Sequence, residues 1–91
     1  MELNRLTDKE LEKGKHLFKV EGQMGLICWY LYNKSVPPMD IDKHFEFSPN
    51  TTNAVIRRNL ELFEKVDKIG KRIVFTTSEE GRKLVEKIIK S

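Results

Sequence analysis

The stretch SPNTTNAVIRRNLELFEKV, residues 48–66, decides how the rest of the chain is interpreted. Successive residues of a helix turn by about 100°, and on that wheel Leu60 and Phe63 lie within about 40° of Ile56. The other aliphatic residues of the stretch widen the same apolar arc. The pattern predicts an amphipathic helix over about residues 50–66, the longest of the chain, with this arc against the core.

The opposite side of this helix is polar and begins with small side chains. Thr51, Ala54 and Arg58 lie there, and Asn50 and Arg57 flank them. Small side chains ahead of two arginines let the positive end of the helix dipole approach an anionic partner closely. In a DNA groove, Arg contacts guanine or phosphate, Asn contacts adenine and Thr meets a thymine methyl. The pattern favours a helix that contacts DNA. The alternative is a solvated face on which Arg57 pairs with the glutamate four residues later.

Length and composition set the class of protein. A chain of 91 residues, 38% hydrophobic and 34% charged, is expected to form one soluble domain. Its longest nearly apolar run, residues 24–32, is far too short to span a bilayer. The charged N-terminus is not a signal peptide, so an intracellular, cytoplasmic protein is expected. The single cysteine excludes an internal disulfide.

Positive charge is concentrated in the second half of the chain. The formal net charge is +3. Residues 1–21 carry net 0 and residues 22–47 carry net −1, whereas residues 48–91 hold ten basic and six acidic side chains, net +4. A local basic excess is the electrostatic signature of a polyanionic partner.

Local signals predict the remaining helices. The motif TDKE at residue 7 fits a capping box and opens a helix over about residues 8–20. Residues 23–33 form a second predicted helix that is apolar on all sides, so more than one neighbour must cover it. After the extended SVPP segment, a short helix over about residues 40–46 begins at Asp40 as its cap.

In the last third of the chain, the spacing of the apolar residues no longer has the period of a helix. β-Branched and aromatic residues around Gly70-Lys71 predict a β-hairpin over about residues 67–77. The motif TSEE at residues 77–80 fits a second capping box, and it opens a final helix. The apolar stripe of that helix consists of Leu84, Val85, Ile88 and Ile89. The expected fold class is mainly α with a small β-hairpin, an α+β fold.

This order of elements resembles the winged helix-turn-helix family of DNA-binding regulators over about residues 23–91, with residues 1–22 as an N-terminal helical extension. The motif IRRNLELF, residues 56–63, is similar to the family's recognition-helix rhythm. The motif RIVFTTSEEGRKLVEKI, residues 72–88, looks like its wing strand and the helix that follows. The chain resembles in particular small MarR-like and PadR-like regulators and short archaeal and archaeal-viral winged-helix proteins.

The resemblance implies a transcriptional regulator that binds double-stranded DNA sequence-specifically. The helix over residues 50–66 would enter the major groove, and the wing over residues 67–77 would lie on the backbone or the minor groove. Together with the polar front of the helix, it gives the predicted DNA contacts Asn50, Thr51, Thr52, Asn53, Ala54, Arg57, Arg58, Lys71 and Arg72. The alternative is a winged-helix protein-interaction module within a larger complex that does not bind DNA directly.

Two apolar surfaces exceed what a small domain buries easily: the all-round apolar helix and the terminal stripe. With the N-terminal helix as a third contributor, they suggest a twofold homodimer. The predicted interface consists of Leu11, Phe18, Trp29, Tyr30, Leu84, Val85, Ile88 and Ile89. Base stacking is the alternative role for the aromatic residues of the second helix.

The sequence contains no constellation that indicates catalysis. His16 and His44 have no second metal ligand at a suitable spacing, and Cys28 lies in an apolar helix that suits a small core residue. No glycine-rich phosphate loop and no nucleophile–base pair is present. We therefore expect a protein that is not an enzyme and that needs no cofactor and no metal.

Overall fold

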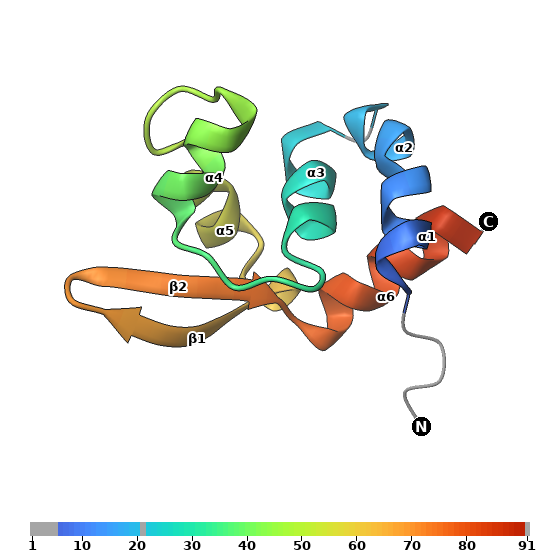
Figure 1. Ribbon diagram of the computed structural model, residues 1–91. Coiled ribbons are helices and arrows are strands. Elements are labelled where there is room, and N and C mark those ends of the chain that lie inside the picture. The colour runs from blue at the N-terminus through green and yellow to red at the C-terminus, as the bar shows by residue number, and fades with distance from the viewer. Residues whose placement is uncertain (1–5, 21, 91) are drawn as a thin grey trace.

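The computed structural model describes residues 6–20 and 22–90, which form a mainly helical fold with a two-stranded antiparallel hairpin, as the predicted fold class requires (Figure 1). In chain order the elements are α1 (Asp8–Lys13), α2 (Lys15–Val20), α3 (Gly22–Tyr30), α4 (Pro38–Phe45), α5 (Thr51–Arg58), the 3₁₀ turn η1 (Leu60–Leu62), β1 (Phe63–Ile69), β2 (Arg72–Thr77) and α6 (Glu79–Lys90). None of the helices in these ranges has the length and apolar composition needed to cross a membrane.

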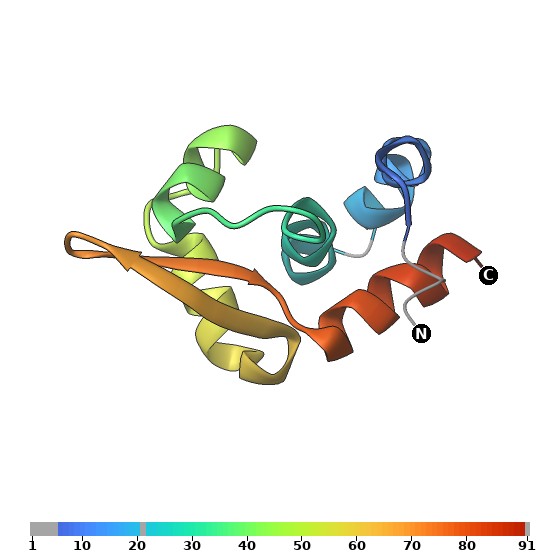
Figure 2. The ribbon, with the colours of Figure 1, turned by 60° about the horizontal axis from the view of Figure 1, so that its bottom comes forward.

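Helix α3 lies at the centre of the fold. It contacts α2 on one side, α5 on the other, and also α6 and β2. Figures 1 and 2 both show it between the N-terminal helices and the α4–α5 pair. Ile27, Cys28 and Trp29 are buried, and so are Leu31 and Tyr32 just beyond its end. The expectation that several neighbours cover an all-round apolar helix is therefore confirmed.

The N-terminal segment forms two short helices, not the single predicted helix over residues 8–20. The capping box of Thr7 and Glu10 is present, and the Thr7 backbone N–H lowers the pKa of the Glu10 carboxyl. The helix breaks at Gly14, where a β-carbon would lie only 2.7 Å from Cγ1 of Ile89. The close approach of α6 therefore needs a residue without a side chain at this position.

Polar contacts fasten this N-terminal segment to the rest of the fold. The indole N–H of Trp29 donates to the Leu11 carbonyl at 2.7 Å, and the Leu6 backbone N–H donates to the Tyr32 hydroxyl at 2.9 Å. The Tyr32 hydroxyl in turn donates to Glu86 on α6. Leu6, Leu11 and Phe18 belong to the same hydrophobic core as α3 and α6, so the described N-terminal residues share one core with the rest.

The predicted helix over residues 50–66 is wrong beyond Arg58. Asn59 ends α5: its backbone N–H donates to the Ile56 carbonyl at 3.1 Å, and its side-chain amide donates to the Val55 carbonyl at 2.8 Å. The chain then makes one 3₁₀ turn and becomes a strand from Phe63, which pairs with Thr77. Tertiary pairing with β2 overrides the helical period of this segment.

The hairpin is consequently longer than the predicted wing, because β1 begins four residues earlier than expected. Its turn consists of Gly70 and Lys71, and Gly70 adopts φ +62°, which glycine tolerates without strain. Beside β2, Val36 and Phe75 exchange two backbone hydrogen bonds of 3.1 Å each. This bridge ties the segment between α3 and α4 to the hairpin.

The second predicted capping box, over residues 77–80, does not form, because α6 begins one residue later than expected and the third residue after its cap is Gly81, which has no side chain. Ser78, not Thr77, caps α6, since its hydroxyl accepts the Gly81 N–H at 3.2 Å. The Thr77 hydroxyl donates instead to the Cys28 carbonyl at 2.7 Å and is fully buried. The predicted stripe of α6 does face the core, with Val85 buried and Leu84, Ile88 and Ile89 half-buried against it.

Candidate functional site

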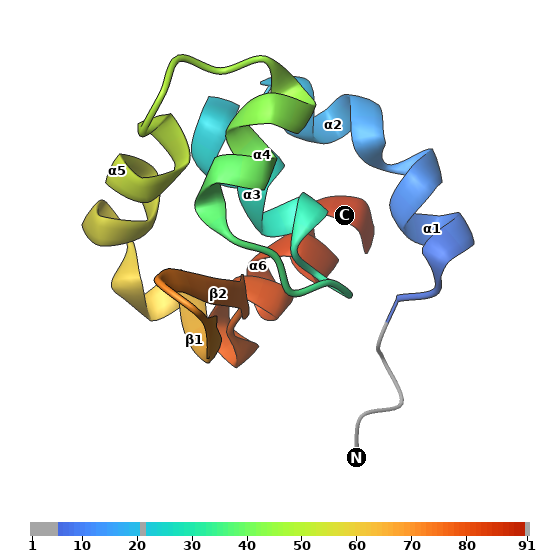
Figure 3. The same cartoon turned by 60° about the vertical axis from the view of Figure 1, so that its left-hand side comes forward.

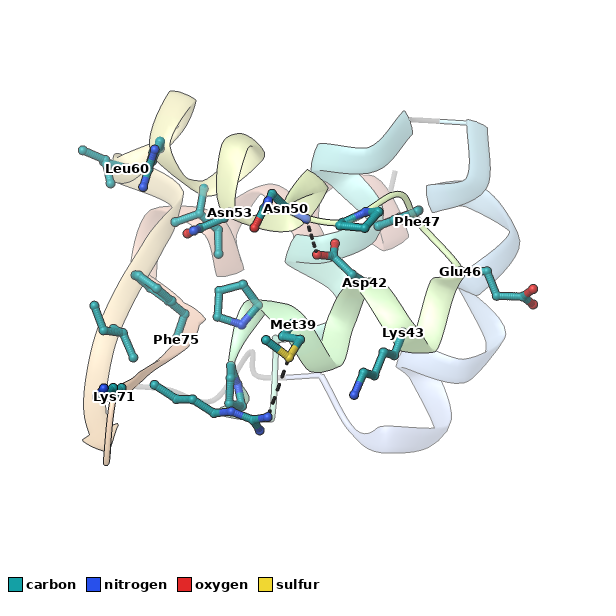
Figure 4. Close-up of a pocket in the computed structure, with 17 residues that line it drawn as sticks. Met39, Asp42, Lys43, Glu46, Phe47, Asn50, Asn53, Leu60, Lys71 and Phe75 are labelled. Atoms are coloured by element: carbon teal, nitrogen blue, oxygen red, sulfur yellow. Dashed lines mark hydrogen bonds between the residues drawn. The ribbon is translucent and has the colours of Figure 1, made fainter.

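Helices α4 and α5 lie beside the hairpin (Figure 3). Between these elements is an open hollow of about 630 Å³ (Figure 4). Arg57 and Arg58 are exposed on the last turn of α5, and Lys71 and Arg72 are exposed at the hairpin turn. Arg57, Lys71 and Arg72 all line the hollow, whereas Arg58 is not among its lining residues. The structure thus brings three of the four predicted cations to one surface feature.

The buried carboxylate of Asp42 on α4 fixes the start of α5. Its Oδ1 accepts the Thr52 backbone N–H at 2.8 Å. Its Oδ2 accepts the Asn50 backbone N–H at 3.1 Å, the bond drawn in Figure 4. The connecting turn needs two residues in the left-handed region, Glu46 at φ +58° and Asn50 at φ +68°. Asp42 therefore acts as a helix cap supplied from the preceding helix.

This cap places a negative charge at the helix end that is predicted to face an anionic partner. The positive end of α5 was expected to face an anionic partner, but it already has a carboxylate bound to two of its first N–H groups. The predicted cap of α4 is also wrong, because α4 begins at Pro38 behind Pro37, and Asp40 lies within its first turn.

The polar front of α5 is only partly accessible. Asn50 is exposed, and Thr51, Asn53 and Ala54 are half-buried. Thr52 is fully buried, so the prediction that it contacts DNA is wrong: its side chain points into the fold while its N–H pairs with Asp42. Its hydroxyl has no hydrogen-bond partner among the described residues.

We expect Thr52→Val to raise the free energy of unfolding by about 1 kcal/mol, because it replaces an unpaired buried hydroxyl by a methyl of the same size. The matched control is Thr77→Val, which removes an equally buried hydroxyl that does have a partner, the Cys28 carbonyl. That variant should lose about 1 kcal/mol. Urea denaturation of both variants checks the pair, and equal changes in the same direction would contradict it.

Arg72 links the hairpin turn to α4. Its guanidinium lies 3.7 Å from a carboxylate oxygen of Asp40. It also donates to the sulfur of Met39 at 3.7 Å (Figure 4). Both partners of the ion pair are about half exposed, so the pair adds little to stability, about 0–1 kcal/mol. Its consequence is geometric, since it holds the hairpin turn beside the first turn of α4.

Three other cations around the hollow have no such partner. Lys43, Arg57 and Lys71 form no ion pair within the part of the chain that the structure describes. The alternative pairing of Arg57 with Glu61 is not among those ion pairs, and Glu61 lies in η1, beyond the end of α5. The positive charges at this surface are therefore available to an external anion.

The inner surface of the hollow is apolar, which the sequence reasoning missed. Met39 is 51% exposed, Leu60 64% and Ile73 38%, and all three line the hollow together with Phe75. Leu60 had been assigned to the core line of a longer helix, and its exposure follows from the end of that helix at Arg58. The early helix stop at Asn59, a residue that favours turns, was the local signal.

Half of the predicted dimer interface is buried within the chain. Leu11, Phe18, Trp29 and Val85 are core residues, so the prediction is wrong for them: the N-terminal helices already cover α3 and α6. Tyr30, Leu84, Ile88 and Ile89 are half-buried. Tyr30 stacks on His44 at 4.6 Å between ring centroids, with the Lys34 ammonium 4.1 Å from its ring centroid.

The candidate nucleophile and metal ligands of the sequence can be checked in the described residues. Burial raises the pKa of the Cys28 thiol to about 12, which keeps it protonated at neutral pH and unreactive. Residues 6–20 and 22–90 contain no group of three or more His, Cys, Asp or Glu side chains that could hold a metal ion.

The chain was compared with protein-family models, with curated proteins and with solved structures, and none of them matches it.

Proposed function

We propose that this protein is a sequence-specific regulator that binds double-stranded DNA, with α5 in the major groove and the β1–β2 hairpin on the backbone or minor groove. The observation that carries the proposal is the set of exposed cations on α5, Arg57 and Arg58, and on the hairpin turn, Lys71 and Arg72, three of which line one hollow. Clustered cations on a helix and a loop beside it are typical of a nucleic-acid surface.

The arrangement of elements also supports the proposal. Helix α4, a turn and α5 would form the helix-turn-helix, the hairpin would form the wing, and the Val36–Phe75 bridge would join the wing to the helices. The Asp42 cap is important for DNA recognition, because a recognition helix must hold its side chains in a fixed register against base edges. A rigid α4–α5 connection supplies that register.

The cations divide into two roles. Arg58 lies one turn after Ala54, a small residue that leaves room for close approach, so its guanidinium can make a bidentate contact to guanine. Lys71 and Arg72 stand at the hairpin turn, where they can reach phosphates. Phosphate contacts orient the protein but carry little sequence information.

The test is binding of purified protein to duplex DNA at different salt concentrations. Affinity should fall steeply between about 50 and 200 mM salt, because bound cations release counterions from the duplex. Arg58→Ala should cost about 1–3 kcal/mol of discrimination against a scrambled duplex. The double variant Lys71→Ala, Arg72→Ala should weaken binding to the specific and the scrambled duplex alike. It should also lower the slope of log affinity against log salt concentration by about one unit for each phosphate that is no longer neutralised.

Lys83→Ala is the matched control, since Lys83 is an exposed cation on α6, away from the hairpin turn (Figure 1). It should leave both affinities nearly unchanged. Absent binding at low salt would overturn the proposal in favour of a winged-helix protein-interaction module within a larger complex. Stoichiometry from the same titration reports whether the protein binds as the predicted homodimer, which would have to use surfaces such as that around Tyr30.

A further inference from the structure

The hollow between the hairpin and α4–α5 has an apolar surface that DNA does not account for. Of the four large apolar side chains that are most exposed in the described residues, three line it: Met39, Leu60 and Ile73. They come from α4, η1 and β2, elements far apart in the sequence, so the fold itself assembles the patch. Exposed apolar patches with a polar rim mark surfaces that bind another molecule.

The rim of the hollow is cationic. Lys43, Arg57 and Lys71 stand on it without ion pairs among the described residues. Of the two acidic residues on the lining, Asp42 is engaged by two backbone N–H groups, which leaves Glu46. An occupant should therefore combine an apolar part, for the interior, with negative charges along its flanks.

We propose that this hollow is the docking site for an amphipathic acidic segment of a partner protein. Apolar side chains of the segment would enter between the hairpin and the helices, against Met39, Leu60 and Ile73, while its carboxylates would face the cationic rim. The hollow is half open to solvent and spans three elements, which suits a helix laid across it more than a small molecule enclosed within it.

One consequence rests on the proposed function. Arg57, Lys71 and Arg72 line the hollow and are also proposed DNA contacts. The acidic segment and the duplex would compete for the same cations, so the partner would release the protein from DNA. The docking site itself does not depend on DNA binding, and its first test is made without DNA.

Three labelled peptides of about 15 residues serve as probes, with binding followed by fluorescence polarisation. The first has Leu at positions i, i+3, i+4 and i+7 and Glu at most others; the second keeps Leu but replaces Glu by Lys; the third keeps Glu but replaces Leu by Ser. Only the first should bind, and amide NMR shifts should map to α4, η1 and β2. Binding of none at about 1 mM, or equal binding of the first and third, overturns the proposal.

Leu60→Glu tests the location, because it puts a charge into the patch at a side chain that is 64% exposed and not needed for the core. It should weaken the first peptide at least about ten-fold. Val66→Glu is the matched control: Val66 is 48% exposed on β1 and is not part of this hollow. Equal weakening by both variants would contradict the assignment, and thermal melts confirm that both are folded.

Two further measurements separate the alternatives. If decanoate displaces the first peptide from the wild type as well as an unlabelled copy of the peptide does, the occupant is a small amphipathic acid, and the protein-segment proposal is overturned. In the presence of DNA, the first peptide should displace the duplex. A protein that binds the peptide but no DNA refutes the proposed function alone, whereas one that binds DNA but no peptide refutes this inference alone.

Discussion

Gly81→Ala is expected to lower the free energy of unfolding by about 3 kcal/mol, although alanine favours a helix over glycine. Gly81 lies in the first turn of α6, where a β-carbon would overlap the carbonyl oxygen of Leu62 and the methyl of Thr77. The Leu62 carbonyl cannot move freely, because it accepts the Ser78 N–H at 2.9 Å. Ser78 is itself fixed by its hydroxyl, which donates to the Glu61 carbonyl at 2.6 Å.

Thermal unfolding measures this effect. A loss of about 3 kcal/mol in a domain of this size lowers the melting temperature by roughly 12–24 °C. Gly14→Ala is the matched control, since the atoms that its β-carbon would crowd, at 2.7 and 2.9 Å, are Cγ1 and Cδ1 of the Ile89 side chain and not backbone atoms. That side chain can rotate, so the expected loss is about 1 kcal/mol. If Gly14→Ala is the more damaging of the two, the packing of α6 against η1 is not the tighter contact.

Asp42→Ala is expected to lower the free energy of unfolding by about 2–4 kcal/mol. It removes a charged acceptor from two hydrogen bonds, to the backbone N–H groups of Asn50 and Thr52. Asn50 is exposed, so its N–H can donate a hydrogen bond to water instead. Thr52 is fully buried, so its N–H would be left without an acceptor. Urea denaturation gives the change directly.

Two variants bracket this result. Asp42→Asn keeps one carbonyl acceptor without the charge and should lose about half as much. Asp40→Ala removes the neighbouring acid, whose half-exposed ion pair with Arg72 should contribute no more than about 1 kcal/mol. Comparable losses for Asp40→Ala and Asp42→Ala would show that α5 does not depend on the cap. If α5 also reads DNA, Asp42→Ala should weaken sequence discrimination in the fraction that remains folded.

Local chemistry was sufficient to predict several features of this fold. The capping box at Thr7 and Glu10 formed because both partners lie within one turn of each other. The turn at Gly70-Lys71 formed because a left-handed residue was needed there and glycine supplies it. The exposure of Arg57, Arg58, Lys71 and Arg72 follows from the cost of burying a charge, which any fold must respect.

The predictions failed where a distant segment determined the local structure. Residues 63–66 were predicted as the end of a helix, yet they form a strand because β2 lies beside them and pairs with this segment from Phe63 onward. That pairing moved Leu60 from the core to the surface and thereby created the apolar side of the hollow. Sequence periodicity cannot detect such an event, since the partner strand is supplied by the fold.

Some features of the candidate site also follow from the sequence, and others follow only from tertiary packing. The sequence by itself determined which side chains carry its charge, because exposure of Arg and Lys depends on solvation of each group and not on its neighbours. Only the tertiary structure decided that Asp42 would occupy the N-terminus of α5, that Thr52 would be buried, and that half of the predicted dimer surface would be buried within the chain. Each of these depends on which elements pack together, and packing is settled by the summed burial of the whole chain, which no single segment encodes.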